Sequence, residues 1–596
     1  MKLAISTLRN QYRGGQAKPS DVIAAIYDLV RRETQPVWIS LIPRERALAR
    51  ARELESDPAA AALPLYGIPF AIKDNIDLAG VPTTAGCPAY SYTPQRSATV
   101  VEKLLAAGAI VICKTNLDQF ATGLVGTRSP YGACSSVYDA RYISGGSSSG
   151  SAVAVAKELV SFSLGTDTAG SGRIPAAFNN LVGLKPSRGL LSAAGVVPAC
   201  RSLDCVSVFA TNCSDAQTVW RVAKGCDPRD PYSRVPGPGA GAAPWAGGSF
   251  RFGVPAPYQL EFFGDQEYAE MYNAGVARLE QMGGTRVEID FSIFRAVAEL
   301  LYAGPWVAER LAAIQPFFES NADDMNPVVR GVIGGARKFS AVDAFEAEYR
   351  LRGFRRDAER EWSRMDVLVV PSAPTIYTQD EIASDPVRRN TNLGYYTNFV
   401  NLLDQAAVAT PGGFRSDGLP FGITFIGRAF TDEALLAVAD RFHRAHTDVA
   451  GPAVDLGACP PGCIAVAVVG AHLSGQPLNR QLTDRHARLM KTTKTLSCYR
   501  FYALPGTQPP KPGLVREEGY EGPGIEVEVW AVPENEFGSF VAGVPPPLGI
   551  GSATLEGGDV VKCFICEPYG LRDALEITQF GGWRAFLASQ ALPARV

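Results

Sequence analysis

The sequence predicts a large α/β domain followed by a small α+β domain. Three observations carry this prediction. The chain has 596 residues, more than a single hydrophobic core usually serves. Between about residues 65 and 215, short apolar strands alternate with helical segments, as in layered α/β domains. Beyond residue 462, predicted strands follow one another, separated by turn residues.

The large domain begins with a predicted helix. Residues 20–32 combine amphipathic spacing with a serine at the start, which predicts a helix capped by Ser20. Residues 97–108 predict a second helix that ends at Gly108. Apolar runs predict strands at 65–73, 109–116, 161–167, 367–375 and 421–427, with a small-residue helix at 151–160 and mainly helical sequence from about 265 to 365.

Two segments rich in proline and glycine interrupt this pattern. Residues 227–249 predict an exposed connection, and residues 451–462 predict the domain boundary. We therefore expect a first domain at 1–450, a linker at 451–462 and a second domain at 463–596. In the second domain, strands are predicted at 464–471, 498–505, 525–533 and 559–568.

Composition is typical of a globular protein in water. Apolar residues make up 46% of the chain and charged residues 20%, and the net charge of −3 favours neither nucleic acid nor an anionic membrane. No apolar stretch approaches the length of a membrane span, and the first residues lack a secretory signal. The twelve cysteines are scattered without a paired framework, which predicts reduced thiols and a cytoplasmic location.

Histidine is scarce and absent from most of the chain. The sequence has four histidines, and the first of them is His443. A hydrolase in the first 440 residues must therefore work without a histidine base or a histidine metal ligand. This excludes Ser-His-Asp, Cys-His and zinc designs for that region, and lysine is the leading remaining activator of a serine.

Three segments together predict such a site: GIPFAIKDN around Lys73, YISGGSSSGSAVAVA around Ser147 and SLGTDTAGSGRIPAAF around Ser171. Each alone has an ordinary explanation, namely a surface charge, a flexible loop and a turn. Together, Lys73 closes an apolar strand, where desolvation favours the neutral amine that acts as a base. Ser171 follows a strand and two small residues, so that backbone N–H groups can converge near its hydroxyl as an oxyanion hole.

These segments resemble the amidase signature family. The family motifs appear here as GGSSSGS at 145–151 and GTDTAGSGRIP at 165–175, with Ser149 and Ala169 where glycine is usual. The resemblance covers roughly residues 20–445 and implies a mixed central sheet covered by helices. It also implies that Ser171 is the nucleophile, that Ser147 is a bridging serine on a cis peptide and that Lys73 is the base. The implied oxyanion donors are the backbone N–H groups of Thr168, Ala169, Gly170 and Ser171.

The segment ELLYAGPWVAERLAA at 299–313 bears on the substrate. It resembles the substrate-recognising helix of allophanate hydrolases, in which a tyrosine and an arginine eight positions later contact the substrate; here these are Tyr302 and Arg310. A spacing of eight places both on neighbouring parts of one helix face. A guanidinium holds a carboxylate with two parallel hydrogen bonds, and allophanate is a urea that carries a carboxylate. The alternative is that Tyr302 packs in the core and Arg310 is a solvated charge.

The residues from about 464 onward resemble the C-terminal domain of the same family, whose fold is similar to γ-glutamylcyclotransferases. In the family this domain is implicated in decarboxylating N-carboxycarbamate, the product that the amidase domain releases. His472, in GAHLSGQPLN, matches the family's functional histidine. A lone histidine is otherwise more often structural, but its position in a loop after a strand favours a site.

Two other functions stay open. One is a different signature amidase, acting on another small amide such as malonamate or serving as the amidase component of a tRNA-dependent amidotransferase. The other is an inactive scaffold or binding protein. No cofactor and no metal are implied, because neither a phosphate-binding loop nor metal-ligand spacing occurs. The resemblance implies a homodimer, and the substrate would come from a separate urea carboxylase or a biuret-degrading enzyme.

Overall fold

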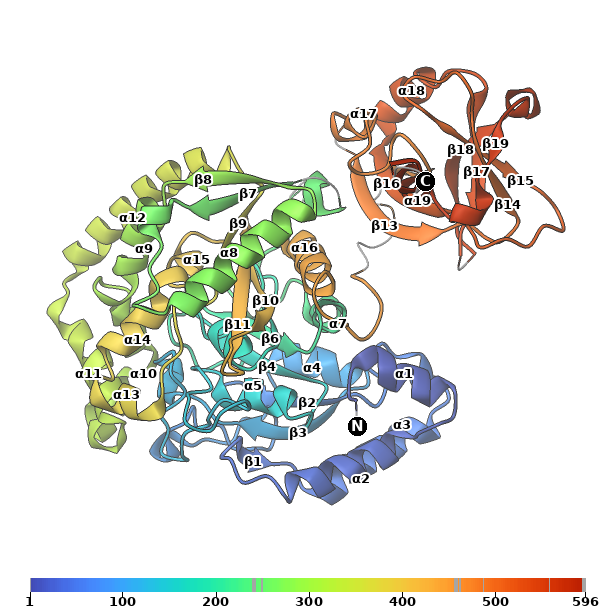
Figure 1. Ribbon diagram of the computed structural model, residues 1–596. Helices are drawn as coiled ribbons and strands as arrows, with labels where there is room; N and C mark the ends of the chain where they lie inside the picture. The colour runs from blue at the N-terminus through green and yellow to red at the C-terminus, as the bar shows by residue number, and fades with distance from the viewer. Residues whose placement is uncertain are drawn as a thin grey trace. The chain divides into compact units, whose positions relative to one another are not determined.

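The protein divides into two compact units in a computed structural model (Figure 1). The structure describes residues 2–237, 243–247, 250–454, 459, 463–485, 487–556 and 558–591. The first unit comprises Met1–Gly241 and Arg251–Val454, and the second comprises Ala242–Phe250 and Asp455–Val596. Of the predicted linker 451–462, only 451–454 and 459 belong to the described residues.

An eleven-stranded mixed sheet forms the centre of the first unit, in the order β1-β3-β2-β4-β6-β5-β10-β11-β9-β7-β8. β2 pairs in parallel with β3 and β4, whereas the central strands from β4 to β9 pair antiparallel. The strands are β1 (Trp38–Leu41), β2 (Pro69–Lys73), β3 (Ile110–Thr115), β4 (Phe162–Asp167), β5 (Val182–Lys185), β6 (Cys205–Ala210), β7 (Phe250–Pro255), β8 (Gly284–Ile289), β9 (Val367–Pro371), β10 (Ala406–Phe414) and β11 (Pro420–Gly427).

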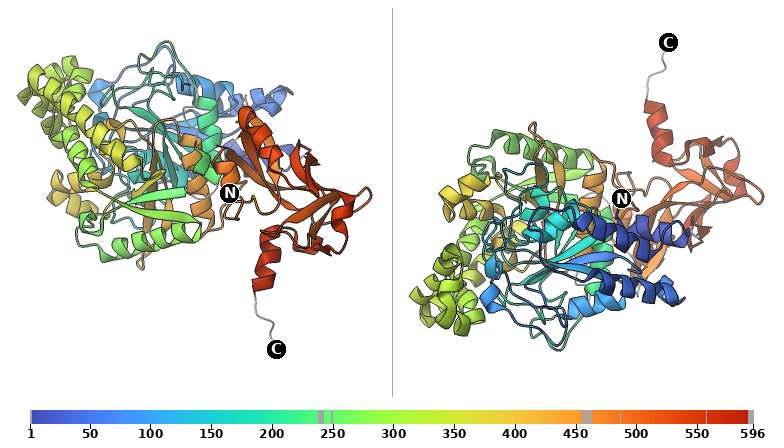
Figure 2. Two further views of the ribbon diagram at one scale, coloured as in Figure 1. Left: turned by 90° about the horizontal axis from the view of Figure 1, so that it is seen from above. Right: turned by 90° about the horizontal axis from the view of Figure 1, so that it is seen from below.

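Helices cover this sheet, as the family resemblance implies. α1 (Ile5–Arg13), α2 (Pro19–Val30) and α3 (Arg44–Ser56) lie at one end of the unit, and α9 to α14 gather at the other, as Figures 1 and 2 show. The remaining helices are α4 (Thr99–Ala106), α5 (Ser149–Ala156), α6 (Ile174–Phe178), α7 (Cys213–Ala223), α8 (Gln266–Gln281), α9 (Ser292–Tyr302), α10 (Val307–Asn321), α11 (Pro327–Gly334), α12 (Ala341–Trp362), α13 (Gln379–Ser384), α14 (Arg388–Leu393), α15 (Phe399–Leu402) and α16 (Asp432–Arg444).

Two local predictions were wrong. α2 begins at Pro19 with Lys18 at the N-cap, because proline fits the first helical position and leaves the serine inside the helix. The segment 227–249 is not exposed throughout. Ala243 and Ala246 are buried, and the short helical turn Pro244–Gly247 belongs to the second unit. The proline and glycine content predicted a connecting segment, but it did not predict that part of this segment is buried.

The second unit contains a five-stranded sheet, in the order β13-β16-β12-β18-β17, and a three-stranded sheet, β15-β14-β19. Its core includes Trp530 and Trp583, both buried. The strands are β12 (Cys463–Val468), β13 (Arg488–Lys494), β14 (Tyr499–Ala503), β15 (Pro512–Arg516), β16 (Glu526–Pro533), β17 (Leu548–Thr554), β18 (Val560–Cys566) and β19 (Leu575–Glu576), and the helices are α17 (Arg480–Thr483), α18 (Glu534–Ala542) and α19 (Trp583–Ala591).

Throughout the described part of the chain, the helices lack the combination of length and apolar character that a bilayer crossing requires.

Candidate active site

The predicted lysine lies at the end of a buried strand. β2 runs between β3 and β4, and all five of its residues are buried. Lys73 is its last residue and is fully buried. The Nζ of Lys73 lies 2.8 Å from Ser147 Oγ and 2.8 Å from Thr166 Oγ1. The strand therefore places the amine inside the protein, against two hydroxyl groups.

The two predicted serines continue this line of contacts. Ser147 Oγ donates to Ser171 Oγ at 2.9 Å, and both side chains are buried. Ser147 lies in the serine-rich loop before α5, where the peptide bond from Gly146 is cis. Ser171 lies in the loop after β4. The fold thus joins Lys73, Ser147 and Ser171 through hydrogen bonds, although 74 and 24 residues separate the neighbours in sequence.

Burial sets the protonation of the lysine. Removal of the ammonium from water lowers the pKa of Lys73 from its ordinary 10.5 to about 7. The carboxylates of Asp118, Asp167 and Asp204 oppose this shift, whereas the charge of Arg310 adds to it. Near pH 7 a large fraction of the lysine is therefore a neutral amine, which is the form that takes up a proton.

The loop after β4 offers backbone donors. Among the hydrogen bonds between described residues, none uses the N–H groups of residues 168–171. Asp167 holds the loop, because it accepts from the Gly172 N–H at 3.0 Å and pairs with the buried Arg173 at 2.9 Å. Gly170 has a φ of +151°, whereas Ala169 avoids the left-handed region, so that alanine fits there. These N–H groups are available to an anion beside Ser171.

The carboxylate of Asp204 holds the side chain of Thr168, which lies in the same loop. Thr168 Oγ1 donates to Asp204 Oδ1 at 2.5 Å, and the N–H groups of Ala199 and Cys200 donate to the same carboxylate. Burial raises the pKa of Asp204 to about 6, although these donors and the charge of Arg310 oppose the shift. The carboxylate therefore carries most of its negative charge at pH 7, close enough to influence Lys73.

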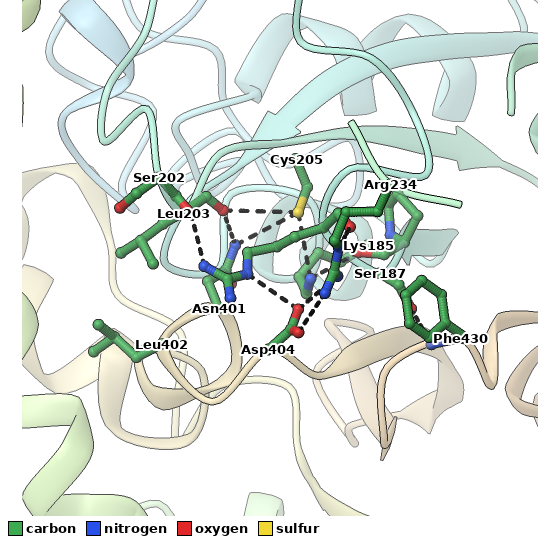
Figure 3. Close-up of polar contacts among 12 residues, drawn as sticks. Lys185, Ser187, Ser202, Leu203, Cys205, Arg234, Asn401, Leu402, Asp404 and Phe430 are labelled. Carbon is green, nitrogen blue, oxygen red and sulfur yellow. Dashed lines mark hydrogen bonds and ion pairs between the residues drawn. The ribbon is translucent and has the colours of Figure 1, made fainter. Parts of the chain in front are cut away.

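Asn401 connects the same loop to the rest of the unit. Its Nδ2 donates to the backbone oxygens of Asp167 at 2.8 Å and Leu203 at 3.0 Å, and its Oδ1 accepts from Arg173 at 3.4 Å. Figure 3 shows the amide of Asn401 directed toward Leu203, with the carboxylate of Asp404 nearby. Asn401 therefore ties together the segments that carry Asp167 and Asp204.

Tyr302 and Arg310 are not on one helix, so the prediction of a shared helix face was wrong. Tyr302 is the last residue of α9, and Arg310 lies in the first turns of α10. Gly304 and Pro305 fall between the two helices, because proline removes a backbone donor and glycine weakens the helix. The two side chains still meet: Arg310 Nη2 donates to the Tyr302 hydroxyl at 3.3 Å.

Arg310 is a buried guanidinium with part of its donor capacity unused. Its side chain is 2% exposed. Nη1 donates to Thr122 Oγ1 at 2.9 Å and to the backbone oxygen of Ala121 at 3.3 Å. Nε is buried and has no partner among the described residues. A carboxylate that accepted from Nε and Nη2 would satisfy this edge with two parallel bonds.

The loop that holds Arg310 is itself held by a buried carboxylate. Asp118 accepts from the N–H groups of Gly126 at 3.0 Å and Arg128 at 2.9 Å. Phe120 and Ala121 both have a φ of +51°, a left-handed conformation that non-glycine residues seldom adopt. The turn that directs the Ala121 carbonyl at the guanidinium is therefore fixed by its surroundings rather than by local preference.

His472 lies in the second unit, beside a cavity of about 250 Å³. Its Nε2 lies 3.0 Å from Gln481 Oε1, and its ring stacks on Phe564 with centroids 4.9 Å apart. Burial lowers the pKa of His472, the hydrogen bond with Gln481 opposes this, and the charge of Lys511 adds to the lowering. The neutral form of the imidazole is therefore favoured.

Sequence reasoning missed several residues of the first site. Thr166 and Arg173 lie within the motif GTDTAGSGRIP. The presence of both Asp167 and Arg173 in this short motif could have indicated an ion pair. Asp118, Thr122 and Asp204 gave no signal. They are single polar residues in loops, and only the fold brings them to the site.

Comparisons with known proteins identify both parts of the chain. A family model described as Amidase matches residues 21–436, and one described as allophanate hydrolase C-terminal domain matches residues 464–588. Urea amidolyase of Saccharomyces cerevisiae is 46% identical over 575 residues, which are 92% of this chain and 31% of the relative. A glutamyl-tRNA(Gln) amidotransferase subunit of Geobacillus stearothermophilus is 32% identical over 472 residues, 74% of this chain and 97% of that protein.

Solved structures agree with these matches. The structure of Kluyveromyces lactis allophanate hydrolase is 43% identical, with a TM-score of 0.78, and the match covers 99% of this chain and 100% of that one. The structure of K. lactis urea amidolyase matches with the same TM-score of 0.78. That match covers 99% of this chain but only 37% of the urea amidolyase chain. The chain therefore spans about a third of the length of the urea amidolyases that it matches.

Proposed function

Because the chain belongs to the amidase family and also carries an allophanate hydrolase C-terminal domain, we propose that it hydrolyses allophanate. The first unit would release ammonia and N-carboxycarbamate, and the second would assist decarboxylation of that product. In total, allophanate would be converted to ammonia and carbon dioxide. The partial coverage of the urea amidolyases makes this activity a proposal for the present chain.

The observation that carries the proposal is the unused edge of Arg310 near the catalytic lysine. A buried guanidinium with an unpartnered Nε selects a substrate that brings a negative charge. Its charge also influences the pKa of Lys73, so the two groups share one electrostatic environment. Allophanate has a carboxylate at one end and an amide at the other, which matches a cation at one end of a site and a nucleophile at the other.

The proposed reaction begins with proton transfer from Ser171. Neutral Lys73 accepts the proton of Ser147, and Ser147 accepts the proton of Ser171 as Ser171 Oγ attacks the amide carbon. The bond distances of 2.8 Å and 2.9 Å suit both transfers. Hydroxyl hydrogens rotate, so Ser147 can donate toward the lysine once the amine is neutral.

The N–H groups of residues 168–171, which have no partner among the described residues, would stabilise the oxyanion of the tetrahedral intermediate. Loss of one such donor typically costs about 3–4 kcal/mol of the barrier. The protons return through Ser147 to the leaving nitrogen, and ammonia departs. Water then hydrolyses the acyl-enzyme on Ser171 by the same relay, and N-carboxycarbamate leaves.

Product analysis tests both halves of the proposal. We expect the intact protein to release two ammonia molecules for each allophanate consumed, one from the amide and one after decarboxylation. His472→Ala should leave release of the first ammonia unchanged and slow the appearance of the second, because the altered side chain is in the second unit. Absence of ammonia release by the intact protein would disprove the proposal. An unchanged second step in His472→Ala would remove the role of the histidine.

A second candidate is hydrolysis of another small amide. The 32% identity with the glutamyl-tRNA(Gln) amidotransferase subunit keeps this candidate, since the same relay serves uncharged amides as well. A panel of allophanate, malonamate, biuret, acetamide and glutamine separates the two. Preference for allophanate over the other four amides favours the first candidate, and turnover of malonamate, biuret, acetamide or glutamine that equals or exceeds that of allophanate favours the second.

The partners and the location follow from the same proposal. Allophanate would be supplied by a urea carboxylase or a biuret-degrading enzyme in the cytoplasm, and the protein would act as a homodimer. Light scattering coupled to gel filtration tests the dimer. A mass of one chain, 63.6 kDa, at working concentration would contradict it.

A further inference from the structure

The cavity beside His472 has a mainly apolar wall that includes one lysine. Its lining comprises apolar side chains and a few polar ones, of which the polar ones are His472, Gln481, Gln508 and Lys511. Lys511 is the only charged residue among the described residues that line it. Small-molecule sites in proteins combine an apolar wall with a few placed polar groups in this way.

His472 is held at this cavity by one hydrogen bond and by two aromatic rings. Its Nε2 faces Gln481 Oε1 at 3.0 Å, and an amide oxygen only accepts, so Nε2 carries the hydrogen. Phe564 stacks on the ring, and Phe540 contacts it edge-on with centroids 5.5 Å apart. In the neutral ring Nδ1 is then an acceptor. In this neutral form the imidazole offers no positive charge to an anionic ligand.

The backbone of Lys511 is held by hydrogen bonds, and its side chain lines the cavity. Its N–H donates to Thr507 Oγ1 at 2.9 Å, and its carbonyl accepts from the Leu504 N–H at 3.1 Å. Its side chain is half-buried, and among the described residues no carboxylate pairs with its ammonium. By contrast, Lys491 on β13 pairs with Asp559 at 2.6 Å. An unpaired ammonium held beside an apolar cavity favours a ligand that brings a carboxylate.

We propose that Lys511 is the substrate-binding cation of the second unit and holds a carboxylate of N-carboxycarbamate beside His472. The inference rests on the proposed function for the identity of this ligand. N-Carboxycarbamate has two carboxylates on one nitrogen. With one carboxylate on Lys511, the nitrogen and the other carboxylate extend toward the imidazole and Gln481. Lys511 thus determines that the cavity accepts a small dicarboxylate rather than a neutral amide.

Two measurements on the full-length protein test this role. In the first, ¹³C-labelled allophanate is supplied at mildly alkaline pH, and ammonia release and the N-carboxycarbamate signal are followed together. Lys511→Met should leave the initial ammonia release unchanged while N-carboxycarbamate accumulates, with its enzymatic consumption slowed about 10–100-fold, as expected for loss of a charged hydrogen bond. Lys511→Arg should restore most of the rate. Lys491→Met is the matched control and should behave as the wild type.

The second measurement is independent of turnover. Malonate, a stable dicarboxylate with CH₂ in place of NH, is titrated into an Arg310→Gln protein, so that the first site does not contribute. We expect binding that weakens at least about tenfold in Arg310→Gln/Lys511→Met and that is retained with Lys511→Arg.

The outcomes separate the two proposals. If the wild type releases no ammonia from allophanate, the proposed function fails, and the malonate titration alone decides whether Lys511 binds anions. If ammonia is released but N-carboxycarbamate disappears equally fast in the wild type and Lys511→Met, the role of Lys511 is overturned. Equal malonate affinity with lysine and methionine at this position overturns it as well. A Lys511→Gln variant serves if the methionine variant does not fold.

Discussion

A single buried amine is the centre of this protein's proposed chemistry. Lys73 has no exposed surface, and the cost of burying an ammonium brings its pKa to about 7. Three carboxylates raise that value and one arginine lowers it, so small changes in their charge move the pKa. Each pKa unit corresponds to about 1.4 kcal/mol between the two protonation states.

The pH dependence of the rate should report this lysine. Because the neutral amine is the active form, kcat/KM should fall about tenfold per pH unit below about 7 and level off above it. Asp204→Asn removes a negative charge that stabilises the ammonium, so the inflection should move to lower pH. Asp139→Asn, at a carboxylate paired with Arg141 on the surface, is the control and should leave the inflection in place. An inflection that is the same in all three proteins contradicts the assignment of Lys73 as base.

The guanidinium of Arg310 should control substrate choice. Arg310→Gln should lower kcat/KM for allophanate by at least about 30-fold, because truncating one partner of a buried charge pair costs about 2–5 kcal/mol. Turnover of neutral amides such as acetamide should change much less. Arg330→Gln, which alters an exposed arginine paired with Asp323, provides the control. A parallel loss on both substrate classes would show that Arg310 is structural.

At the scale of elements, the break between α9 and α10 and the loops beside the strands position most side chains of the candidate site. The break at Gly304 and Pro305 turns α10 relative to α9, so that Arg310 meets the Tyr302 hydroxyl. Glu309, next to Arg310, accepts from the N–H of Ser202 at 2.9 Å and so ties α10 to the segment that carries Asp204. This hydrogen bond joins α10 to the segment before β6.

The Asp167–Arg173 pair should be important for stability. Both side chains are fully buried, and the charge of Arg173, against the effect of burial, holds the pKa of Asp167 below its ordinary value. Arg173→Met leaves an unpaired buried carboxylate, so urea unfolding of the first unit should show a loss of about 3–5 kcal/mol. Arg352→Met removes an exposed pair with Glu348 and should cost less than about 0.5 kcal/mol. Comparable losses in the two variants would contradict this account of the ion pair.

At the scale of the molecule, the chain has two units with separate cores and a candidate site in each. Lys73, Ser147 and Ser171 lie in the first unit, and His472 and Lys511 lie in the second. The segment 242–250 belongs to the second unit although it interrupts the first in sequence. Because each unit has its own candidate site, we expect that one proposed step, ammonia release or decarboxylation, can be lost while the other is retained.

A chain that ends at Val454 should retain the first step. It keeps all of the described first unit, so the initial rate of ammonia release from allophanate should stay within about threefold of the full-length value, whereas N-carboxycarbamate should accumulate. Full-length Lys73→Ala is the control and should release no ammonia. If the truncated chain folds, as judged by circular dichroism, but releases no ammonia, the second unit takes part in the first step.

The sequence by itself determined the class of fold, and it predicted the residues of the first candidate site. Histidine is missing before residue 443, and the two serine- and glycine-rich motifs with Lys73 resemble a family in which lysine is the base and serine the nucleophile. Such motifs are local, because a strand end and the loop beside it are encoded by neighbouring residues. The strand predictions around Lys73 and Ser171 agree with β2 and β4 for the same reason.

Only the tertiary structure decided how the substrate end of each site is built. Asp118, Thr122 and Asp204 come from loops with no periodic pattern. Asp118 acts on Lys73 through its charge, Thr122 accepts from Arg310, and Asp204 accepts from Thr168, and each pair joins segments far apart in the chain. The break before α10 and the position of Lys511, which pairs with no carboxylate among the described residues, are likewise consequences of packing. Burial and the pairing of charges depend on what the rest of the chain places around a residue, and a sequence read in one dimension does not contain those neighbours.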